Sequence, residues 1–323
     1  KMYYIGIDLG GTNIAAGVVN ESCEIIAKGS VPTGRLRPFA DIMKDMADLC
    51  KKLIADAGIS ESEVKSIGIA SPGTPDVENV KVVYANNLPA FIDAPVGDEL
   101  KKYFPNVEVY IENDANAAAF GEIIAGAAAG EKDVVVITLG TGVGGGIVIG
   151  GKIYAGFNHA GGELGHMVIV ADGAPCTCGR CGCWEAYASV TGLIRETAEE
   201  IKKYPNSKIH QMIGGDESKI SGRTAFDAMR NGDEAGKAIV DQYIKYVGVG
   251  TANLINIFEP KKFVIGGGIS KEGETLLAPL RKYVDTQIYT SSAAGVPATE
   301  IVAAKLGNDA GIIGAAMLFK QDI

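Results

Sequence analysis

Four cysteines crowd into one short segment of the chain. Cys176, Cys178, Cys181 and Cys183 fall within eight residues, and His166 lies ten residues upstream. Thiolates and imidazoles are the ligands that tetrahedral zinc prefers, and such crowding favours a metal over disulfides. The segment therefore predicts either a four-cysteine zinc site or a site of His166 with three of the cysteines. The ordinary alternative is a loop of unmetallated thiols.

An acidic segment, Glu112-Asn113-Asp114, joins an expected strand at residues 107–111 to an expected helix at residues 115–124. Asp114 could accept a proton from a substrate hydroxyl. The ordinary alternative is that Asn113 or Asp114 caps the helix. A helix N-terminus favours the ionised carboxylate and so lowers its basicity. Phosphoryl transfer tolerates a weak base, because positioning and electrostatics carry most of that catalysis.

Two glycine turns that carry a threonine stand about 130 residues apart. Gly10-Gly11-Thr12 follows a strand at residues 3–8 and precedes one at residues 14–20, and the segment at residues 140–146 has a similar setting. Backbone amides in such turns can point at phosphate oxygens without a lysine. The repetition favours an internal duplication over two unrelated hairpins, with a cleft between two similar domains. Asp8, beside the first turn, either supports Mg²⁺ or caps the turn.

Two familiar phosphate-binding patterns also match, but their structural setting is wrong. Residues 140–145 satisfy the dinucleotide pattern G-x-G-x-x-G, and residues 146–152 satisfy G-x-x-x-x-G-K. Both patterns require a helix to follow, whereas strand-forming residues follow here. Ile153 also replaces the Ser or Thr that holds magnesium in the second pattern. We therefore reject both interpretations.

The elements that must position these groups alternate between strands and helices. The chain has 323 residues, of which 47% are hydrophobic and 43 are glycines. Further strands are expected at residues 24–31, 64–70, 133–139, 147–149, 262–265 and 299–303, and further helices at residues 39–57, 185–204, 233–258 and 310–319. This alternation is typical of the α/β class with mixed sheets. We expect a smaller N-terminal domain at residues 1–117 and a larger domain with the zinc loop at 118–305. A C-terminal helix within residues 306–323 should pack back on the first domain.

Charge and hydropathy narrow the classes of function. The net charge of −9 argues against a nucleic-acid-binding surface, which needs a basic face. No apolar run reaches the roughly 20 residues that span a bilayer. No signal peptide precedes the first strand, so we expect a cytoplasmic protein.

With these motifs in this order, the chain resembles the ROK family of sugar kinases and repressors, within the actin-like ATPase superfamily. The resemblance rests on segments spread over nearly the whole chain, namely residues 8–13, 71–73, 112–114, 139–146, 163–166, 176–185 and 265–270. It implies two actin-like, ribonuclease H-like α/β domains with an interdomain cleft. Among members, the chain is most similar to the bacterial glucokinases. This implies ATP-dependent phosphorylation of the 6-hydroxyl of a hexose, with glucose favoured.

The resemblance also implies a role for each motif residue. Asp114 would be the general base on the sugar 6-hydroxyl, and Asp8 would support Mg²⁺ near the transferred phosphate. The ATP-binding residues would be Asp8, Gly10, Gly11, Thr12, Asn13, Thr141, Gly142, Gly267 and Gly268. The sugar-binding residues would be Gly73, one of Asn86 and Asn87, Asn113, Asp114, Glu163, His166 and Glu185. The structural zinc ligands would be His166, Cys176, Cys178 and Cys183.

Two of these assignments carry consequences of their own. His166 would use one ring nitrogen for zinc and the other for a sugar hydroxyl. This is consistent with the general rule that a partner on the second nitrogen fixes the tautomer of a metal-bound imidazole. Cys181 lies outside the zinc pattern of the family.

Other functions within the family remain open. The sugar could instead be fructose, mannose or N-acetylmannosamine, although Thr74 offers no clamp for a bulky N-acetyl group. A non-catalytic sugar sensor is a further alternative. Repressors of the family carry a DNA-binding segment before the first glycine turn, whereas seven residues precede Asp8 here, so a repressor is not expected. The family tends towards homodimers and homotetramers.

Overall fold

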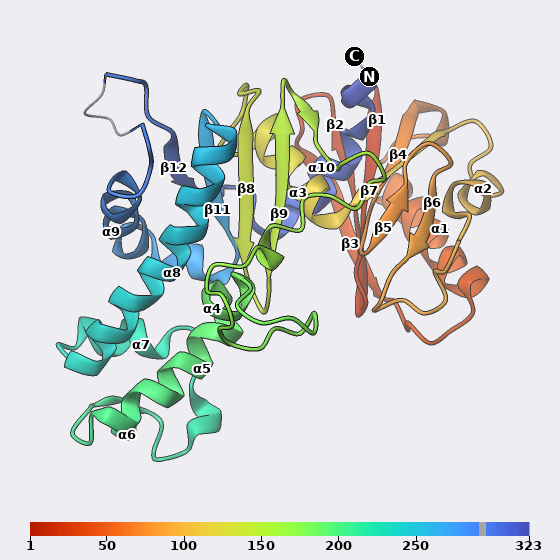
Figure 1. Ribbon diagram of the computed structural model, residues 1–323. Coiled ribbons are helices and arrows are strands. Elements are labelled where there is room, and N and C mark those ends of the chain that lie inside the picture. The colour runs from red at the N-terminus through yellow and green to blue at the C-terminus, as the bar shows by residue number, and fades with distance from the viewer. Residues whose placement is uncertain (291–294, 323) are drawn as a thin grey trace. The chain divides into compact units, whose positions relative to one another are not determined.

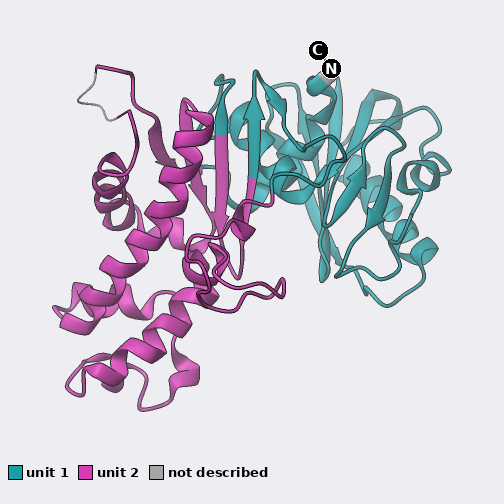
Figure 2. Ribbon diagram, in the orientation of Figure 1, with its two compact units in different colours: residues 1–134, 146–162, 305–323 teal, residues 135–145, 163–304 magenta. Residues whose placement is uncertain are grey.

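The computed structural model describes residues 1–290 and 295–322 (Figure 1). It contains two compact units (Figure 2): residues 1–134, 146–162 and 305–323 form unit 1, and residues 135–145 and 163–304 form unit 2. The expected domain boundaries after residues 117 and 305 stay a prediction. In the structure, the chain passes from one unit to the other after residues 134, 145, 162 and 304.

Unit 1 is built on a five-stranded sheet with the order β3-β2-β1-β4-β7. The strands β1 (Tyr3–Leu9), β2 (Asn13–Asn20) and β3 (Ile25–Pro32) form an antiparallel meander. The strands β4 (Val64–Ser71) and β7 (Glu108–Asn113) continue the sheet in parallel with β1. Residues 5, 7 and 9 of β1 belong to the core cluster that holds the buried residues of α1 (Phe39–Asp56). Since side chains alternate across a strand, residue 6 faces the opposite side.

The helix α10 (Ala310–Ala316) packs against that opposite side of the sheet, with its backbone very close to the backbone of the strands. A Cβ atom at Gly6 would lie 1.8 Å from the Ile312 carbonyl oxygen, and one at Gly68 would lie 1.8 Å from that of Ala315. Only glycine permits this approach. The helix α3 (Asp114–Ala125) packs against α10 in the same way, which explains its small residues. The helix expected over residues 310–319 is shorter than predicted, because the last turn continues as a 3-10 helix, η8 (Leu318–Asp322).

The second five-stranded sheet has the order β10-β9-β8-β11-β12. Its strands are β8 (Val134–Leu139), β9 (Val143–Ile149), β10 (Lys152–Ile153), β11 (Lys262–Gly266) and β12 (Glu300–Ala303). In both sheets three successive strands lie side by side, and two later strands extend the sheet beyond the first of them. This shared order confirms the α/β class with a duplicated plan. The glycine turn is shorter than expected, because β9 already begins at Val143.

The single helix expected over residues 185–204 is wrong. The chain forms α4 (Glu185–Ala188), α5 (Val190–Glu200) and the 3-10 helix η3 (Ile201–Lys203). Ser189 breaks the run, because its backbone is extended and its hydroxyl accepts a hydrogen bond of 3.0 Å from the Gly192 amide. Ser189 therefore caps α5.

The remaining elements complete the two units. The long helix α8 (Glu234–Phe258) is capped by the Asp233 carboxylate, which accepts from the Gly236 amide. The sequence did not predict α2 (Val96–Lys101), α6 (Ile209–Met212), α7 (Thr224–Arg230), α9 (Glu274–Asp285), or the hairpin of β5 (Thr74–Asp76) and β6 (Lys81–Tyr84). Short 3-10 turns include η1 (Glu61–Glu63), η2 (Leu164–His166), η4 (Glu217–Lys219), η5 (Gly268–Glu272) and η7 (Gly307–Asp309).

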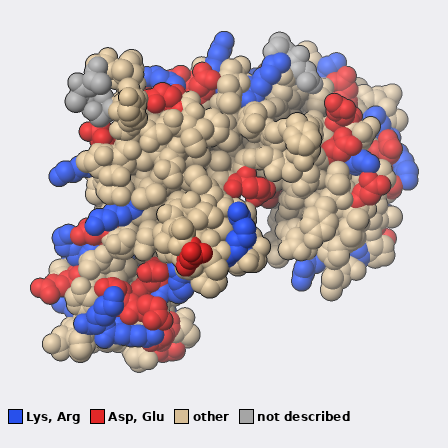
Figure 3. Space-filling model, in the orientation of Figure 1, with Lys and Arg blue, Asp and Glu red and all other residues tan. Residues whose placement is uncertain are grey.

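The surface carries mixed charge. On the face drawn in Figure 3, basic and acidic side chains lie next to one another, most densely over the part that holds α5 and α6. Several are paired along one helical turn, such as Lys203 with Glu200 at 2.7 Å. Among the described residues, none of the helices combines the length and the apolar character that crossing a membrane requires.

Candidate functional site

The first glycine turn joins β1 to β2 and is held by its own backbone and by a distant threonine. The Gly10 amide donates to the Asn13 carbonyl at 2.9 Å, which closes the turn. The Thr33 hydroxyl donates to the Gly10 carbonyl at 2.7 Å, and the Thr33 amide donates to the Thr12 carbonyl at 2.8 Å. Both carbonyls are thereby occupied from the β3 side. This arrangement pins the loop of residues 10–12 in one shape.

The turn lies beside one of the expected sugar-binding asparagines. A Cβ atom at Gly11 would come 3.2 Å from Asn87 Nδ2. The neighbouring Asn86 accepts from the Tyr84 hydroxyl at 3.3 Å, and both asparagines are exposed. Gly73 is anchored next to the same segment, with φ of 80° and no space for a side chain against the Tyr84 carbonyl.

Asn113 is the residue that caps α3. Its Oδ1 atom accepts from the amides of Ala115 at 3.0 Å and Asn116 at 3.3 Å, and its Nδ2 atom donates to the Gly73 carbonyl at 3.0 Å. Asp114 is thus the first residue of the helix, with an exposed side chain whose Oδ1 accepts from the Ala115 amide at 2.8 Å. Of the two capping residues that the sequence allowed, the structure selects Asn113. The cap therefore does not depend on the Asp114 carboxylate.

Asp8 and Asp114 form an electrostatically coupled pair of carboxylates. Burial, and secondarily the charge of Asp114, raise the pKa of Asp8 from its ordinary value of 3.8 to about 6. A Cβ atom at Gly311 of α10 would lie 3.1 Å from Asp8 Oδ2, so the carboxylate sits against a helix that leaves little room. Two acidic groups that repel each other suit a hard divalent cation, which binds oxygen ligands.

We expect Asp8→Asn to stabilise the protein at neutral pH, although it removes a carboxylate that could hold a divalent cation. The pKa of Asp8 is higher in the folded protein than in the unfolded chain. The protonated side chain therefore contributes stability that is fully present below about pH 4 and is lost as the pH rises through about 6. Above that pH the ionised group costs about 2–3 kcal/mol, and the amide should recover about 1–3 kcal/mol of it. Thermal unfolding at pH 7.5 without added Mg²⁺ measures this gain, which should vanish at pH 4. A variant less stable than the wild type at pH 7.5 would contradict this assignment.

The second glycine turn joins β8 to β9 within unit 2 and is tied to Glu185. The Gly140 amide donates to the Gly142 carbonyl at 3.0 Å. The Glu185 Oε2 atom accepts from the Val143 amide at 2.9 Å, and a Cβ atom at Gly142 would come 2.4 Å from it. The Thr191 hydroxyl donates to the Thr141 carbonyl at 2.8 Å. Glu185, expected at the sugar, therefore also supports this turn.

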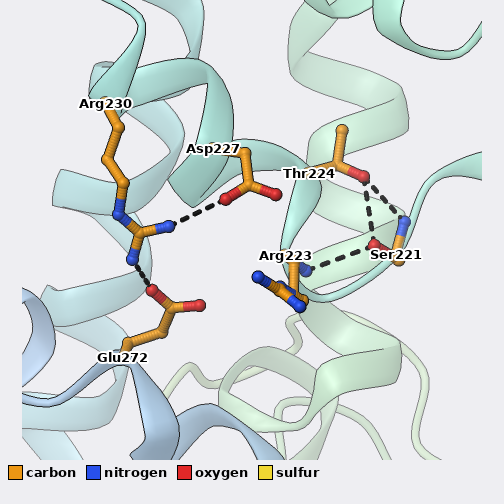
Figure 4. Close-up of polar contacts among 6 residues, drawn as sticks. All are labelled: Ser221, Arg223, Thr224, Asp227, Arg230 and Glu272. Atoms are coloured by element: carbon orange, nitrogen blue, oxygen red, sulfur yellow. Dashed lines mark hydrogen bonds and ion pairs between the residues drawn. The ribbon is translucent and has the colours of Figure 1, made fainter.

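The Gly267-Gly268 segment lies where β11 leaves the sheet. Gly267 has φ of 85°, and a Cβ atom there would come 2.4 Å from the Leu139 carbonyl oxygen at the end of β8. The following turn, η5, is fastened to α7. Figure 4 shows the guanidinium of Arg230 bonded to both Asp227, at 2.8 Å, and Glu272 of η5. This clamp holds the segment that follows Gly268.

We expect Gly267→Ala to destabilise the protein by about 2–4 kcal/mol, because it adds backbone strain and a clash with a main-chain oxygen. The adjacent Gly268→Ala is the matched control, since a Cβ atom there meets nothing within 4 Å. Chemical unfolding of both variants checks the difference. Equal stabilities of the two variants would refute it.

The cysteine segment places four ligand atoms around one point. One ring nitrogen or thiol from each of His166, Cys176, Cys178 and Cys183 lies within 4.8 Å of all the others. The Cys178 and Cys183 sulfurs are 3.6 Å apart, and His166 Nδ1 lies 3.7 Å from the Cys176 sulfur. Sulfurs bound tetrahedrally at about 2.3 Å from zinc are about 3.8 Å apart, so the set fits that ion.

Local contacts help to hold this cluster. Hydrogen bonds from Arg180 lower the pKa of the Cys178 thiol, which favours the thiolate that binds metal. The Arg180 side chain also donates to the His166 carbonyl at 2.6 Å. Cys181 is exposed and is not part of the four-atom group. Of the two ligand sets that the residues alone allowed, the geometry favours the one with His166.

The expected site residues fall into two groups, one in each unit. In unit 1 the structure gathers Asp8, Gly10, Gly11, Thr12, Asn13, Gly73, Asn86, Asn87, Asn113 and Asp114 through the contacts above. In unit 2, Glu185 joins the Thr141-Gly142 turn to the cysteine segment, since its Oε1 lies 3.2 Å from the Thr177 hydroxyl. The exposed Glu163 stands before η2, and its carbonyl accepts from the His166 amide at 3.0 Å.

Sequence reasoning missed several supporting residues. Thr33 and Thr191 hold the two glycine turns from 23 and 50 positions away in the chain, and Arg230 pairs with Glu272 across 42 positions. Their types carry no local signal, because threonine and arginine are common on surfaces and at turns. Contacts this distant in sequence become visible only in the folded chain.

Comparison with known proteins identifies the family of this chain. The profile described as "ROK family" matches residues 4–322. A glucokinase of Thermotoga maritima is 39% identical over 323 residues, which cover 100% of this chain and 99% of that protein. A glucokinase of Halalkalibacterium halodurans is 37% identical over 320 residues, covering 99% of this chain and 95% of that protein. A crystal structure of a ROK family glucokinase from Streptomyces griseus, in complex with glucose and AMPPNP, is 36% identical with a TM-score of 0.78 and covers 98% of both chains. Because the family profile spans nearly the whole sequence, the chain belongs to the ROK family.

Proposed function

We propose that the protein is an ATP-dependent hexose kinase that transfers the γ-phosphoryl group of ATP to the 6-hydroxyl of glucose. The observation that carries the proposal is the position of Asp114. It is the first residue of α3, and Asn113 caps that helix, so the Asp114 carboxylate is not needed as the cap. Relatives named glucokinase, and a related structure holding glucose and an ATP analogue, support the substrate pair.

In the proposed reaction, Asp114 accepts the proton of the sugar 6-hydroxyl. The sugar oxygen forms a bond to the γ-phosphorus as the bond between that phosphorus and the β–γ bridging oxygen breaks. ADP leaves with the electron pair. A weak base suffices because most of the catalysis comes from positioning and from charge stabilisation.

We assign phosphate binding to the two glycine turns, with Gly10, Gly11, Thr12 and Asn13 in one and Thr141 and Gly142 in the other. The Gly10 and Gly140 amides close the turns. We therefore assign the anionic oxygens to the amides that follow, at Gly11 and Thr12 in the first turn and at Thr141 and Gly142 in the second. Gly267 and Gly268 are assigned to the adenosine. Asp8 would hold Mg²⁺, directly or through water, and the ion neutralises phosphate charge when bound.

We assign sugar binding to the polar groups around Asp114 and around the cysteine segment. Gly73, one of Asn86 and Asn87, and Asn113 contribute from unit 1, and Glu163, His166 and Glu185 contribute from unit 2. The Nδ1 atom of His166 faces the Cys176 sulfur at 3.7 Å, which leaves Nε2 for a sugar hydroxyl. Carboxylates, amides and an imidazole together suit a polyhydroxylated ligand.

We assign a structural zinc ion to His166, Cys176, Cys178 and Cys183. The four ligand atoms are preassembled, and Cys183 is fully buried. The ion supplies a cross-link that fixes the orientation of His166 and of the neighbouring segment. We also expect a homodimer or homotetramer, which sedimentation analysis of the purified chain would test.

The proposed function is tested by sugar-dependent release of ADP from ATP with Mg²⁺ present. We expect glucose to give the highest kcat/KM in a panel with mannose, fructose and N-acetylmannosamine. A higher kcat/KM for another hexose would move the protein to that substrate. If no sugar elicits ADP release, the kinase proposal is refuted, and glucose binding without turnover would identify the protein as a sugar sensor.

A further inference from the structure

Glu112 is a buried carboxylate that the proposed set of binding and catalytic residues does not use. It lies near the end of β7, two positions before Asp114, and only 4% of it is exposed. Asn116, on the first turn of α3, is equally buried at 3%. Burying an ionisable group costs free energy unless its interactions compensate. Its surroundings therefore bear on its function.

The Glu112 Oε1 atom accepts two hydrogen bonds that span the junction between β7 and α3. One comes from the Asn113 amide at 2.8 Å, and the other comes from Asn116 Nδ2 at 3.1 Å. Asn113 in turn caps α3 and donates to the Gly73 carbonyl at 3.0 Å. One continuous network thus links the last strand residues, the first helical turn and Gly73, and Asp114 stands inside it.

The ionised form of Glu112 is a stronger hydrogen-bond acceptor than an uncharged side chain would be. Burial raises the pKa of Glu112, while its two hydrogen-bond donors and the nearby His159 oppose that rise. Glu112 and His159 also line the same cavity of about 260 Å³, together with Tyr110, Tyr154 and Gln321. Hydrogen bonds to a charged acceptor are roughly twice as strong as neutral ones. A glutamine could accept the same two bonds but would lack this strength.

We propose that Glu112 is a positioning residue for phosphoryl transfer: its carboxylate locks the junction of β7 and α3, and so holds the Asp114 carboxylate in its productive direction. This inference rests on the proposed role of Asp114 and deepens it. Catalytic groups must be held within about 0.5 Å of their working geometry, and a displacement of about 1 Å costs up to about 100-fold in rate. Glu112 itself touches no reacting atom.

The test measures whether Glu112 acts through Asp114. Glu112→Ala removes the acceptor, Glu112→Gln keeps its shape, and Glu108→Gln on the same strand is a control at an exposed position. We expect kcat to fall about 30- to 100-fold in Glu112→Ala and about 3- to 10-fold in Glu112→Gln. Glu108→Gln should retain wild-type kcat. Unchanged kcat in both Glu112 variants overturns the proposal.

A second step separates positioning from a structural role. Each Glu112 variant is combined with Asp114→Asn, and kcat is measured per folded molecule. If Glu112 acts by positioning Asp114, its substitution should change kcat by less than about 2-fold in the Asp114→Asn background, because the carboxylate that it positions is absent there. An undiminished effect in that background overturns the inference and leaves the proposed function intact. If Glu112→Ala fails to fold, the Glu112→Gln pair decides by the same criterion. Full activity of Asp114→Asn alone would instead refute the role of Asp114 as the base, on which this inference rests.

Discussion

Asp114→Asn is expected to lower turnover by about 10²- to 10⁴-fold, the usual contribution of a general base, while sugar affinity changes only a few-fold. Asparagine has nearly the shape of aspartate. Its side-chain oxygen can still accept the hydrogen bond that the Ala115 amide donates to Asp114 at 2.8 Å. The amide is not basic, so it cannot take the proton from the sugar hydroxyl. The substitution therefore removes the chemistry and preserves the local structure.

This result is measured by steady-state ADP release together with calorimetric binding of glucose. Asp41→Asn provides a matched control, since Asp41 is an exposed carboxylate in the first turn of α1. That control should turn over at the wild-type rate. If Asp114→Asn retained near-normal turnover, Asp114 would not be the base. Loss of binding without loss of kcat would make it a binding group only.

Cys178→Ser is expected to abolish zinc binding and to lower kcat/KM for glucose by about 10- to 100-fold. Structural zinc contributes on the order of 10 kcal/mol to the folding of small zinc domains, so the cysteine segment should loosen without it. His166, whose Nδ1 faces the Cys176 sulfur, would then lose its fixed orientation. Zinc content by elemental analysis and kcat/KM on the same sample measure both effects.

Cys181→Ser is the matched control for this prediction. Cys181 lies within the same segment but outside the four-ligand group, and its side chain is exposed. The control should retain one zinc ion per chain and wild-type activity. Zinc retained in Cys178→Ser, or lost in Cys181→Ser, would show that the ligand set is a different one.

The duplicated plan of the fold was predictable because each sheet begins with the same local pattern. A strand, a glycine turn with a threonine and a second strand recur at Gly10-Gly11-Thr12 and Thr141-Gly142, and both sheets have equivalent strand orders. Helix boundaries were less predictable. The apolar pattern runs through Ser189, and only the side-chain hydrogen bond to the Gly192 amide shows that the helix restarts there.

The site was predictable where one residue type implied one chemistry, and it was ambiguous where two residues competed for one place. The thiols of the cysteine segment indicated a metal, but the choice between Cys181 and His166 depends on where the chain folds back. The choice between Asn113 and Asp114 as helix cap depends on side-chain direction. Glu112 was missed as a supporting residue, because its partner Asn116 is buried only after α3 packs.

The position of the phosphate on the product tests the central claim most directly. Wild-type protein is incubated with ATP, Mg²⁺ and glucose, and the product is examined by correlated phosphorus and proton NMR. The proposed function predicts equal amounts of ADP and a sugar phosphorylated at carbon 6. Phosphate on another carbon, or ADP with free phosphate and unmodified glucose, would contradict it.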